Sequence, residues 1–235
     1  MTEPDPVLLI TGANSGIGAA TARAAASDYR LVLAARRLEP TQELAAELGG
    51  EERALAVRCD VTEWDQVEAM AAAGLERFGR IDAVFANAGF GASRGFLEES
   101  VEQWRSMILT NVYGVALTIR ATLPHLLDRG DGHFLITSSI AGRRALPGSL
   151  YSATKWAATA MGESLRAELR TMHENTEIKV TLIEPGMVDT PFFDNRPGDW
   201  ALSDDDIARA VMFALEQPAG VDVNEILIRP TNQPI

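Results

Sequence analysis

The chain has 235 residues, 46% of them hydrophobic and 23% charged, proportions that are ordinary for a globular domain with a full core. With 21 Lys and Arg against 33 Asp and Glu, the net charge is −12, which disfavours binding to nucleic acid or to an anionic membrane. The first residues show no signal-peptide pattern, and no apolar run approaches the roughly 18 residues that span a bilayer, so no membrane partner is expected.

The first predicted strand and helix enclose a glycine-rich turn. Val7 to Ile10 is a short apolar run, typical of a strand buried on both faces of a parallel sheet. Thr11 to Gly18 follows, and the alanine-rich segment Ala19 to Ala26 predicts a helix. Glycines at such a turn let backbone N–H groups approach phosphate oxygens, and the helix N-terminus adds favourable partial charge. The spacing G-x-x-x-G-x-G indicates a variant dinucleotide-binding loop, with a plain tight turn as the alternative.

Two arginines follow the second predicted strand, Arg30 to Ala35. At this point of a dinucleotide fold an acidic residue accepts from the ribose of NAD, whereas an arginine accommodates the 2′-phosphate of NADP. Arg36 and Arg37 therefore favour NADP(H) over NAD(H), although they could also simply begin the exposed helix predicted over Leu38 to Leu48.

The third predicted strand, Arg53 to Cys59, leads directly into Asp60. Asp60 is a cap residue, a turn residue or an adenine contact, and composition does not separate these readings. We expect Thr62 to be the N-cap of the next helix, with Asp65 as its capping carboxylate, and Gly79 to end that helix after Phe78.

Cys59 is the only cysteine, so no internal disulfide is possible and a reducing, cytoplasmic location is expected. We interpret Cys59 itself as a packed strand residue rather than a reactive thiol. His125, His133 and His173 are scattered without metal-ligand spacing, so no metal site is expected.

The fourth predicted strand, Ile81 to Ala86, ends in the small residues Asn87-Ala88-Gly89, which indicates close approach of the backbone to a ligand. The long helix predicted over Val101 to Leu127 contains Asn111, a residue whose amide competes for backbone groups. A site role, a local distortion of the helix and an exposed polar position would each explain it.

The second half of the chain continues the alternation. A turn at 130–132 precedes a strand at 133–137 that ends in Ser138-Ser139. The remaining expected elements are a helix over 151–172, a strand over 178–183, a mobile loop over 192–203, a helix over 204–216 and a strand over 224–229. Because strand and helix alternate throughout, we expect one α/β domain over residues 1–235, a doubly wound parallel sheet with helices on both faces.

Tyr151 and Lys155 are four residues apart, which places them roughly 5–6 Å apart on one face if the segment is helical. A phenol is a poor acid or base at neutral pH, and a nearby ammonium is expected to lower its pKa toward the working range. A serine hydroxyl from the neighbouring strand end would then bind the substrate oxygen on which charge develops. The alternative is an incidental Tyr/Lys pair on a surface helix.

Taken together, these motifs resemble the short-chain dehydrogenase/reductase family in its compact single-domain branch. The matching pieces are Thr11 to Gly18, Cys59 to Thr62, Asn87-Ala88-Gly89, Asn111, Ser138/Ser139, Tyr151-x-x-x-Lys155 and Pro185-Gly186, all in family order. The resemblance implies a Rossmann-type sheet of about seven strands.

The resemblance also implies roles. Tyr151 would be the general acid/base, Lys155 would lower its pKa and bind the nicotinamide ribose, and Asn111 would support a water linking Lys155 to solvent. Asp60 would lie near adenine, Asn87 near ribose and Thr190 near the carboxamide. The implied cofactor-binding residues are Gly12, Asn14, Ser15, Gly16, Ile17, Gly18, Arg36, Arg37, Asp60, Val61, Asn87, Ala88, Gly89, Tyr151, Lys155, Pro185, Gly186, Val188 and Thr190.

Two departures from the family pattern affect these expectations. The usual spacing to the tyrosine points to Ser138 as the catalytic serine, whereas the Ile140-Ala141-Gly142 context points to Ser139, which we favour because loops absorb deletions more easily than strand ends shift register. Ser15 stands where NADP-preferring members often carry a basic residue.

The expected function is NADP(H)-dependent hydride transfer between a secondary alcohol and a carbonyl compound. Residues 184–188 and 224–231 resemble the NADP-dependent 3-hydroxy acid (serine-type) dehydrogenases, so a 3-hydroxy acid is the expected substrate class. The alternative is a non-catalytic NADP(H)-binding redox sensor. Arg94, Arg143 and Arg144 either meet a substrate carboxylate or are solvated. The apolar patterning of the two long helices predicts a homodimer or homotetramer.

Overall fold

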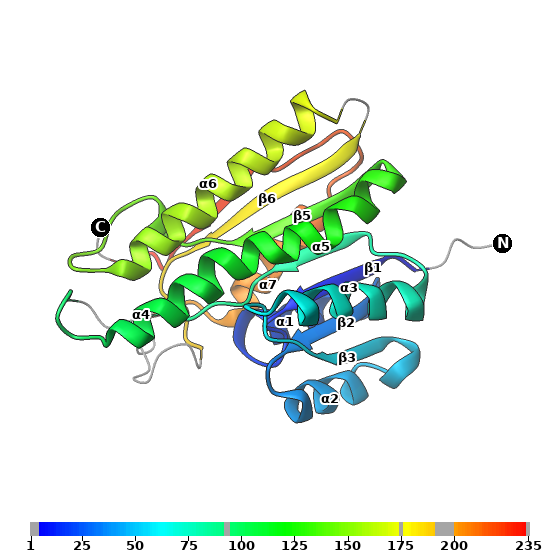
Figure 1. Cartoon of the computed structure of the whole chain (residues 1–235), viewed down its shortest axis with the longest axis horizontal. Coiled ribbons are helices and arrows are strands. Elements are labelled where there is room, and N and C mark those ends of the chain that lie inside the picture. The colour runs from blue at the N-terminus through cyan, green and yellow to red at the C-terminus, as the bar shows by residue number, and fades with distance from the viewer. Residues whose placement is uncertain (1–4, 92–94, 174–175, 191–199, 234–235) are drawn as a thin grey trace.

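In the computed structural model, which describes residues 5–91, 95–173, 176–190 and 200–233, seven parallel strands form one sheet in the order β3-β2-β1-β4-β5-β6-β7 (Figure 1). The strands are β1 (Val7–Thr11), β2 (Arg30–Ala35), β3 (Ala54–Arg58), β4 (Ala83–Ala86), β5 (Asp131–Thr137), β6 (Glu177–Pro185) and β7 (Glu225–Ile228). All seven predicted strands are confirmed, and so is the Rossmann-type parallel sheet.

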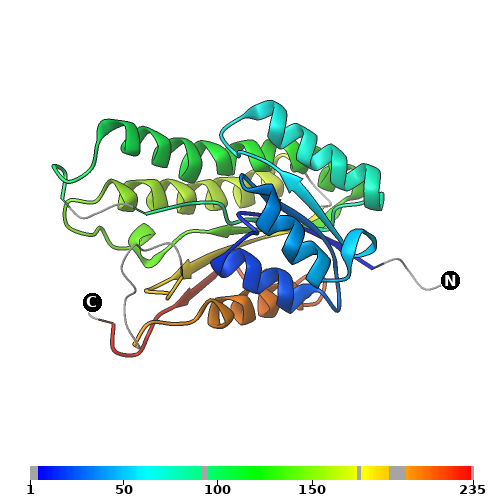
Figure 2. The ribbon, with the colours of Figure 1, turned by 90° about the horizontal axis from the view of Figure 1, so that it is seen from below.

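Helices cover both faces of this sheet (Figure 2). One face carries α1 (Gly16–Ala25), α2 (Leu38–Glu47) and α7 (Asp204–Leu215). The other carries α3 (Trp64–Phe78), α4 (Val101–Ile108), α5 (Gly114–Arg129) and α6 (Leu150–Thr171). The described residues also form three short helical turns, η1 (Gly50–Glu52), η2 (Leu109–Tyr113) and η3 (Ile140–Gly142).

The residues of β1 explain why both faces are covered. All five are buried, with Leu8 and Ile10 packed on the side of α1 and α7 and Val7 and Leu9 on the side of α3 and α5. Because neighbouring side chains of a strand point to opposite faces, a continuous apolar run requires helices on both sides.

Two local expectations are wrong. The N-cap of α3 is Glu63 and not Thr62, whose hydroxyl donates to Asp60 Oδ1 (2.9 Å) in the preceding turn. The turn expected at 130–132 is confined to Gly130, which ends α5 with φ of +80°, and β5 already begins at Asp131. The predicted long helix is confirmed; it continues to Arg129 and passes through a π-helical turn at η2.

The helical segment Val101–Arg129 has 29 residues and contains an 18-residue window with a mean hydropathy of 1.2, values that a membrane-crossing helix would also have. In the fold, α5 packs on β4, β5 and α3, and the preceding η2 turn packs on α6. A helix in the core of a globular protein has the same composition, so packing within this fold accounts for it. The absence of a membrane partner stays a prediction.

Candidate active site

A cavity of about 690 Å³ opens where the carboxyl ends of the strands meet, the usual ligand position in doubly wound sheets. Every residue predicted to be catalytic or to bind the cofactor lines it except Gly18 and Asn111. We name its two regions the glycine-loop end (Gly12, residues 14–17, Arg36, Arg37 and Asp60) and the tyrosine end (Ser139, Tyr151, Lys155 and Asn111 behind them). Further lining residues that no motif predicted include Phe90, Thr110, Thr137, Leu146, Met187 and Gln233.

The glycine loop is closely packed against neighbouring backbone. Gly12 and Gly16 have φ of +67° and +52°, which side chains rarely adopt. A Cβ on Gly18 would come within 2.3 Å of the Gly12 carbonyl oxygen, so Gly18 shapes the loop from behind without lining the cavity. Because this loop starts helix α1, backbone N–H groups and the positive end of the helix face the cavity, as binding of a pyrophosphate requires.

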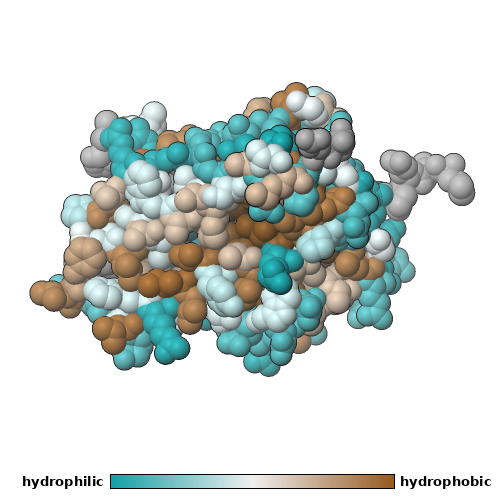
Figure 3. Space-filling view, turned by 45° about the horizontal axis from the view of Figure 1, so that its top comes forward, coloured by the Kyte–Doolittle hydropathy of each residue, from teal (hydrophilic) through white to brown (hydrophobic). Residues whose placement is uncertain are grey.

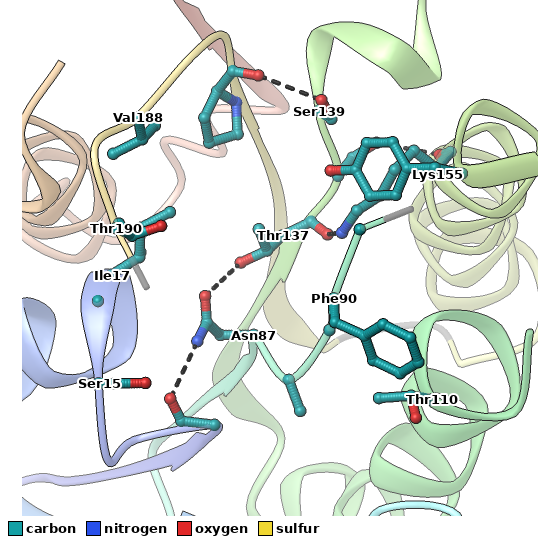
Figure 4. A pocket seen from close by; sticks show the side chains of 18 of the residues that line it. Ser15, Ile17, Asn87, Phe90, Thr110, Thr137, Ser139, Lys155, Val188 and Thr190 are labelled. Atoms are coloured by element: carbon teal, nitrogen blue, oxygen red, sulfur yellow. Dashed lines mark hydrogen bonds between the residues drawn. The ribbon is translucent and has the colours of Figure 1, made fainter. Parts of the chain in front are cut away.

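Asn87 joins the ends of three adjacent strands (Figure 4). Its Nδ2 donates to the Thr11 carbonyl (3.2 Å), its Oδ1 accepts from Thr137 Oγ1 (3.0 Å), and its backbone N–H donates to Thr11 Oγ1 (3.1 Å). The amide therefore fixes the loop 87–89 over the middle of the cavity, between its two ends.

Arg37 is held at the cavity by a residue of the glycine loop. With the Asn14 amide oriented so that its oxygen faces the guanidinium, Oδ1 accepts from Arg37 Nη2 (2.9 Å) and Nε (3.2 Å). Arg36 and Arg37 are both exposed and both line the cavity. The glycine-loop end thus carries two positive charges, one of them with a fixed position.

Asp60 forms a turn, one of the three readings left open. Its Oδ1 accepts from the Thr62 backbone N–H (3.0 Å) and hydroxyl (2.9 Å), and its backbone N–H donates to Gln66 Oε1 (2.9 Å). Asp60 also lines the cavity, as does Val61, so contact with adenine stays a prediction.

Asn111 lies in the π-helical turn η2 and is almost fully buried, with 1% exposure. Its Oδ1 accepts from the Phe90 N–H (3.0 Å), and its Nδ2 donates to the Phe90 carbonyl (2.8 Å) and to Thr154 Oγ1 (3.1 Å). The prediction of a local helix distortion at Asn111 is therefore confirmed, and the prediction of an exposed polar position is wrong. A Cβ on Gly89 would lie 3.1 Å from Asn111 Oδ1 and 3.7 Å from Lys155 Nζ, so the loop passes closely between them.

The two candidate serines point in different directions. Ser138 Oγ lies inside the fold, where it donates to the Lys155 carbonyl (3.0 Å) and lies 2.7 Å from Thr159 Oγ1. Ser139 Oγ accepts from the Ala141 N–H (3.1 Å), donates to the Pro185 carbonyl (3.3 Å) and makes a hydrogen bond with Tyr151. Ser139 is thus the serine that the fold places against the tyrosine.

Tyr151 and Lys155 lie together on α6, with Lys155 Nζ 5.7 Å from the centre of the tyrosine ring. Nζ donates to the carbonyl of Thr137 at the end of β5 (2.7 Å; Figure 4). Burial lowers the pKa of the Lys155 ammonium to about 8. Burial also raises the pKa of the Tyr151 phenol to about 12, a rise that the hydrogen bond with Ser139 only partly offsets.

The pKa of Tyr151 is thus raised, because removal of the phenol from water is the largest effect on it, and the lowering of this pKa by Lys155 stays a prediction. At neutral pH Tyr151 consequently holds its proton. It is poised to donate that proton to an oxygen that gains negative charge.

Arg143, one of the arginines suggested for a substrate carboxylate, is paired with carboxylates of the protein itself. Its Nε donates to Glu184 Oε1 (2.8 Å) and its Nη2 lies 2.5 Å from Glu225 Oε1. Glu184 is 1% exposed, and burial raises the pKa of its carboxyl group. Of the other two arginines suggested for a substrate carboxylate, Arg144 is exposed and Arg94 lies outside the described residues.

Cys59 is buried, as predicted, and burial raises the pKa of its thiol to about 12, so the thiolate required for reactivity is not formed at neutral pH. Within the part of the chain that the structure describes, no three His, Cys, Asp or Glu side chains cluster in a way that could hold a metal ion. The loop expected over 192–203 is described only from Trp200 onward, so the part of this loop before Trp200 lies outside the described residues.

Comparison with known proteins adds to this geometry. The sequence profile of the short chain dehydrogenase family matches residues 6–199. Among solved structures, the chain is similar to an alcohol dehydrogenase of the archaeon Thermococcus sibiricus complexed with 5-hydroxy-NADP, with 36% identity, a TM-score of 0.87 and 99% of each chain covered.

Two further solved structures are similar over almost the whole chain. One is the closed form of a serine dehydrogenase complexed with NADP+, at 31% identity and a TM-score of 0.90, covering 97% of this chain and 96% of that one. The other is a short chain dehydrogenase/reductase of Burkholderia phymatum in complex with NAD, at 30% identity and a TM-score of 0.85, covering 97% of this chain and 90% of that one.

Proposed function

The chain belongs to the short-chain dehydrogenase/reductase family of oxidoreductases, and on that premise we propose that it interconverts a secondary alcohol and a carbonyl compound with NADP(H). The observation that carries the proposal is the tyrosine end of the cavity. Ser139, Tyr151 and Lys155 come from the segment after β5 and from α6, and they line the same cavity as a glycine loop of the kind that binds dinucleotides.

The cavity fits a nicotinamide dinucleotide. Gly12 and Gly16 leave backbone open where phosphates would approach, and Arg36, Arg37 and Asp60 line the part of the cavity where we propose that the adenosine ribose binds. Asn87, Lys155, Val188 and Thr190 line the route toward the tyrosine end, where the nicotinamide ring would lie. The nicotinamide, when bound, supplies or accepts the hydride.

The protein residues handle the proton and the developing charge. Tyr151 donates its phenolic proton to the carbonyl oxygen during reduction and takes it back during oxidation. Ser139 donates a hydrogen bond to the same oxygen. Lys155, held by the Thr137 carbonyl, provides positive charge behind the phenol as the proton leaves it.

The preference for NADP(H) over NAD(H) is supported by the two arginines after β2. A 2′-phosphate carries negative charge that Arg37, already oriented by Asn14, can bind with little loss of side-chain freedom. For the substrate we propose a 3-hydroxy acid or the corresponding 3-oxo compound, because the chain is similar to a serine dehydrogenase and serine is itself a 3-hydroxy acid.

We also propose that the protein is a cytoplasmic homodimer or homotetramer. Val101, Ile108 and Tyr113 on α4 and η2 are 68%, 42% and 47% exposed, and Trp156 on α6 is 49% exposed. Figure 3 shows apolar residues gathered over the face that these helices present. Burial of such a surface favours association, and light scattering of the purified protein measures its mass in solution.

The test is oxidation of NADPH and of NADH by the purified protein against a panel of carbonyl compounds that includes 3-oxo acids, simple ketones and quinones. We expect turnover with NADPH to exceed turnover with NADH, and a 3-oxo compound to be the best substrate. Equal turnover with both cofactors would contradict the proposed preference.

Cofactor binding is measured in parallel by quenching of protein fluorescence. Tight binding of NADPH without turnover of any carbonyl compound would favour the alternative, a redox sensor that works through a partner. Absence of both binding and turnover would overturn the proposed function altogether.

A further inference from the structure

Gln233 reaches the cavity from the last described turn of the chain. Its backbone N–H donates to the Pro230 carbonyl (3.1 Å), which turns the chain back toward the end of β6 after β7 has ended. Its side-chain Oε1 accepts from the Met187 N–H (3.0 Å), and Gln233 lines the same cavity as Ser139 and Tyr151.

This contact fixes which way the amide faces. Only the oxygen of a glutamine side chain can accept from a backbone N–H, so the Nε2 group lies on the other corner of the amide. Among the described residues, no hydrogen-bond acceptor for Nε2 is found. The two N–H groups of Nε2 are therefore available to a molecule that enters the cavity.

The amide lies near the tyrosine end of the cavity. A Cβ on Gly186 would come within 2.1 Å of Gln233 Oε1, so the glycine leaves the space that the amide fills. The residue before it, Pro185, accepts through its carbonyl from Ser139 Oγ (3.3 Å). Gln233 and Ser139 thus contact the same short stretch at the end of β6, one through Gly186 and Met187 and the other through Pro185.

The cations around the cavity lie elsewhere or are paired, so a neutral hydrogen-bond donor is the group that remains at the end of β6. The cations that line the described part of the cavity are Arg36 and Arg37, at the glycine-loop end, and Lys155, which is bound to the Thr137 carbonyl. Arg143, which follows the Ser139 turn, is bound to Glu184 and Glu225. A second oxygen on the substrate would meet an amide N–H at the end of β6.

We propose that Gln233 determines substrate specificity: its Oε1 holds the Gly186–Met187 turn while its Nε2 donates to a second acceptor oxygen near the reacting carbonyl. The ligand class is a 3-oxo compound, either a 3-oxo acid or its ester, because both place an acceptor oxygen beside the carbonyl. This inference rests on the proposed function and names a residue that selects its substrate.

Two variants test the oxygen and the nitrogen of the Gln233 amide separately. Gln233→Ala removes both the acceptor and the donor. Gln233→Glu keeps an oxygen that can accept from the Met187 N–H but replaces the donor by a negative charge. Each is assayed with NADPH on a 3-oxo ester, on the matching 3-oxo acid, and on the ketone of the same chain length that lacks the second oxygen.

With Gln233→Glu we expect the ketone to react at close to the wild-type rate, because the turn keeps its acceptor. The kcat/KM for the 3-oxo ester should fall about three- to tenfold, the effect of one lost hydrogen bond, and that for the 3-oxo acid should fall further through like-charge repulsion. Gln233→Ala should lower kcat/KM for all three, because the Gly186–Met187 turn also loses its acceptor.

Asn232→Ala is the matched control, since Asn232 is the exposed neighbour of Gln233 and does not line the cavity. It should leave the rates with all three substrates unchanged, and NADPH binding should be unchanged in Asn232→Ala and in Gln233→Glu, which keeps the acceptor of the Gly186–Met187 turn. Equal losses on the ketone and the 3-oxo ester with Gln233→Glu, or wild-type rates with both Gln233 variants, would overturn the inference. Wild-type turnover of the panel establishes the proposed function independently, and its absence would overturn both.

Discussion

The two ends of the cavity present different kinds of chemical group to a ligand. At the glycine-loop end, the ligand-facing groups are backbone N–H groups and exposed arginines, with Arg37 oriented by a single amide. At the tyrosine end, Lys155 is 4%, Ser139 7% and Asn111 1% exposed, and each of the three has a hydrogen-bond partner inside the fold.

This difference separates recognition from chemistry. A long exposed side chain can recognise a charged group at little cost to the fold, because water solvates it when the group is absent. A buried polar group must be satisfied by the protein itself, and burial changes its pKa. Substitutions at the glycine-loop end should therefore change cofactor affinity, and those at the tyrosine end should change kcat, pH dependence and stability.

The largest expected effect is that of Tyr151→Phe. Loss of the phenolic proton should lower kcat by about 10²- to 10⁴-fold, while the Kd for NADPH stays near the wild-type value. Steady-state kinetics and fluorescence titration measure the two quantities. Tyr113→Phe is the control, because Tyr113 is 47% exposed and does not line the cavity. Substantial turnover by Tyr151→Phe would show that another group transfers the proton.

The pH dependence should differ between the two directions of the reaction. Because the pKa of Tyr151 is about 12, the phenolate needed to oxidise an alcohol increases about tenfold per pH unit across the neutral range. Reduction uses the protonated phenol and should stay nearly level until Lys155 loses its charge near pH 8. Profiles of kcat against pH for both directions measure this, and an oxidation rate that falls from about pH 6 to about pH 8 would contradict it.

Asn111→Ala tests whether the tyrosine end depends on the buried network behind it. The substitution leaves the Phe90 N–H, the Phe90 carbonyl and the Thr154 hydroxyl without this partner, so the free energy of unfolding should fall by about 2 kcal/mol. Denaturant unfolding measures the loss, and kcat should fall with it. Asn224→Ala, at an exposed position, is the control; equal stability of the two variants would remove the structural role from Asn111.

The smallest expected effects lie at the glycine-loop end. Arg37→Ala should raise the KM for NADPH about tenfold, and Asn14→Ala about threefold because Arg37 remains but is no longer held. Neither should change kcat or the KM for NADH. Arg105→Ala, which removes one exposed charge that does not line the cavity, is the control. An equal rise in KM for both cofactors would mean that these residues shape the loop rather than select the phosphate.

The sequence by itself determined the sheet and most of the cavity wall. Short apolar runs such as Val7 to Ile10 must be buried on both faces, and glycine turns mark the ends of those runs, so the alternation of strand and helix is encoded locally. The residues that line the cavity directly follow strand ends, and parallel strands bring all those ends to one edge.

Tertiary structure decided what depends on the direction of a side chain or on its distance from water. Ser138 and Ser139 are neighbours in sequence, and only the fold places Ser139 against Tyr151 and buries Ser138 against α6. The pKa of Tyr151 is raised, opposite to expectation, because burial of the phenol, a property of the packed protein, is the largest effect on it. Gln233 carries no motif and is far from the cavity residues in sequence, so only the return of the chain after β7 brings its amide to the Met187 N–H.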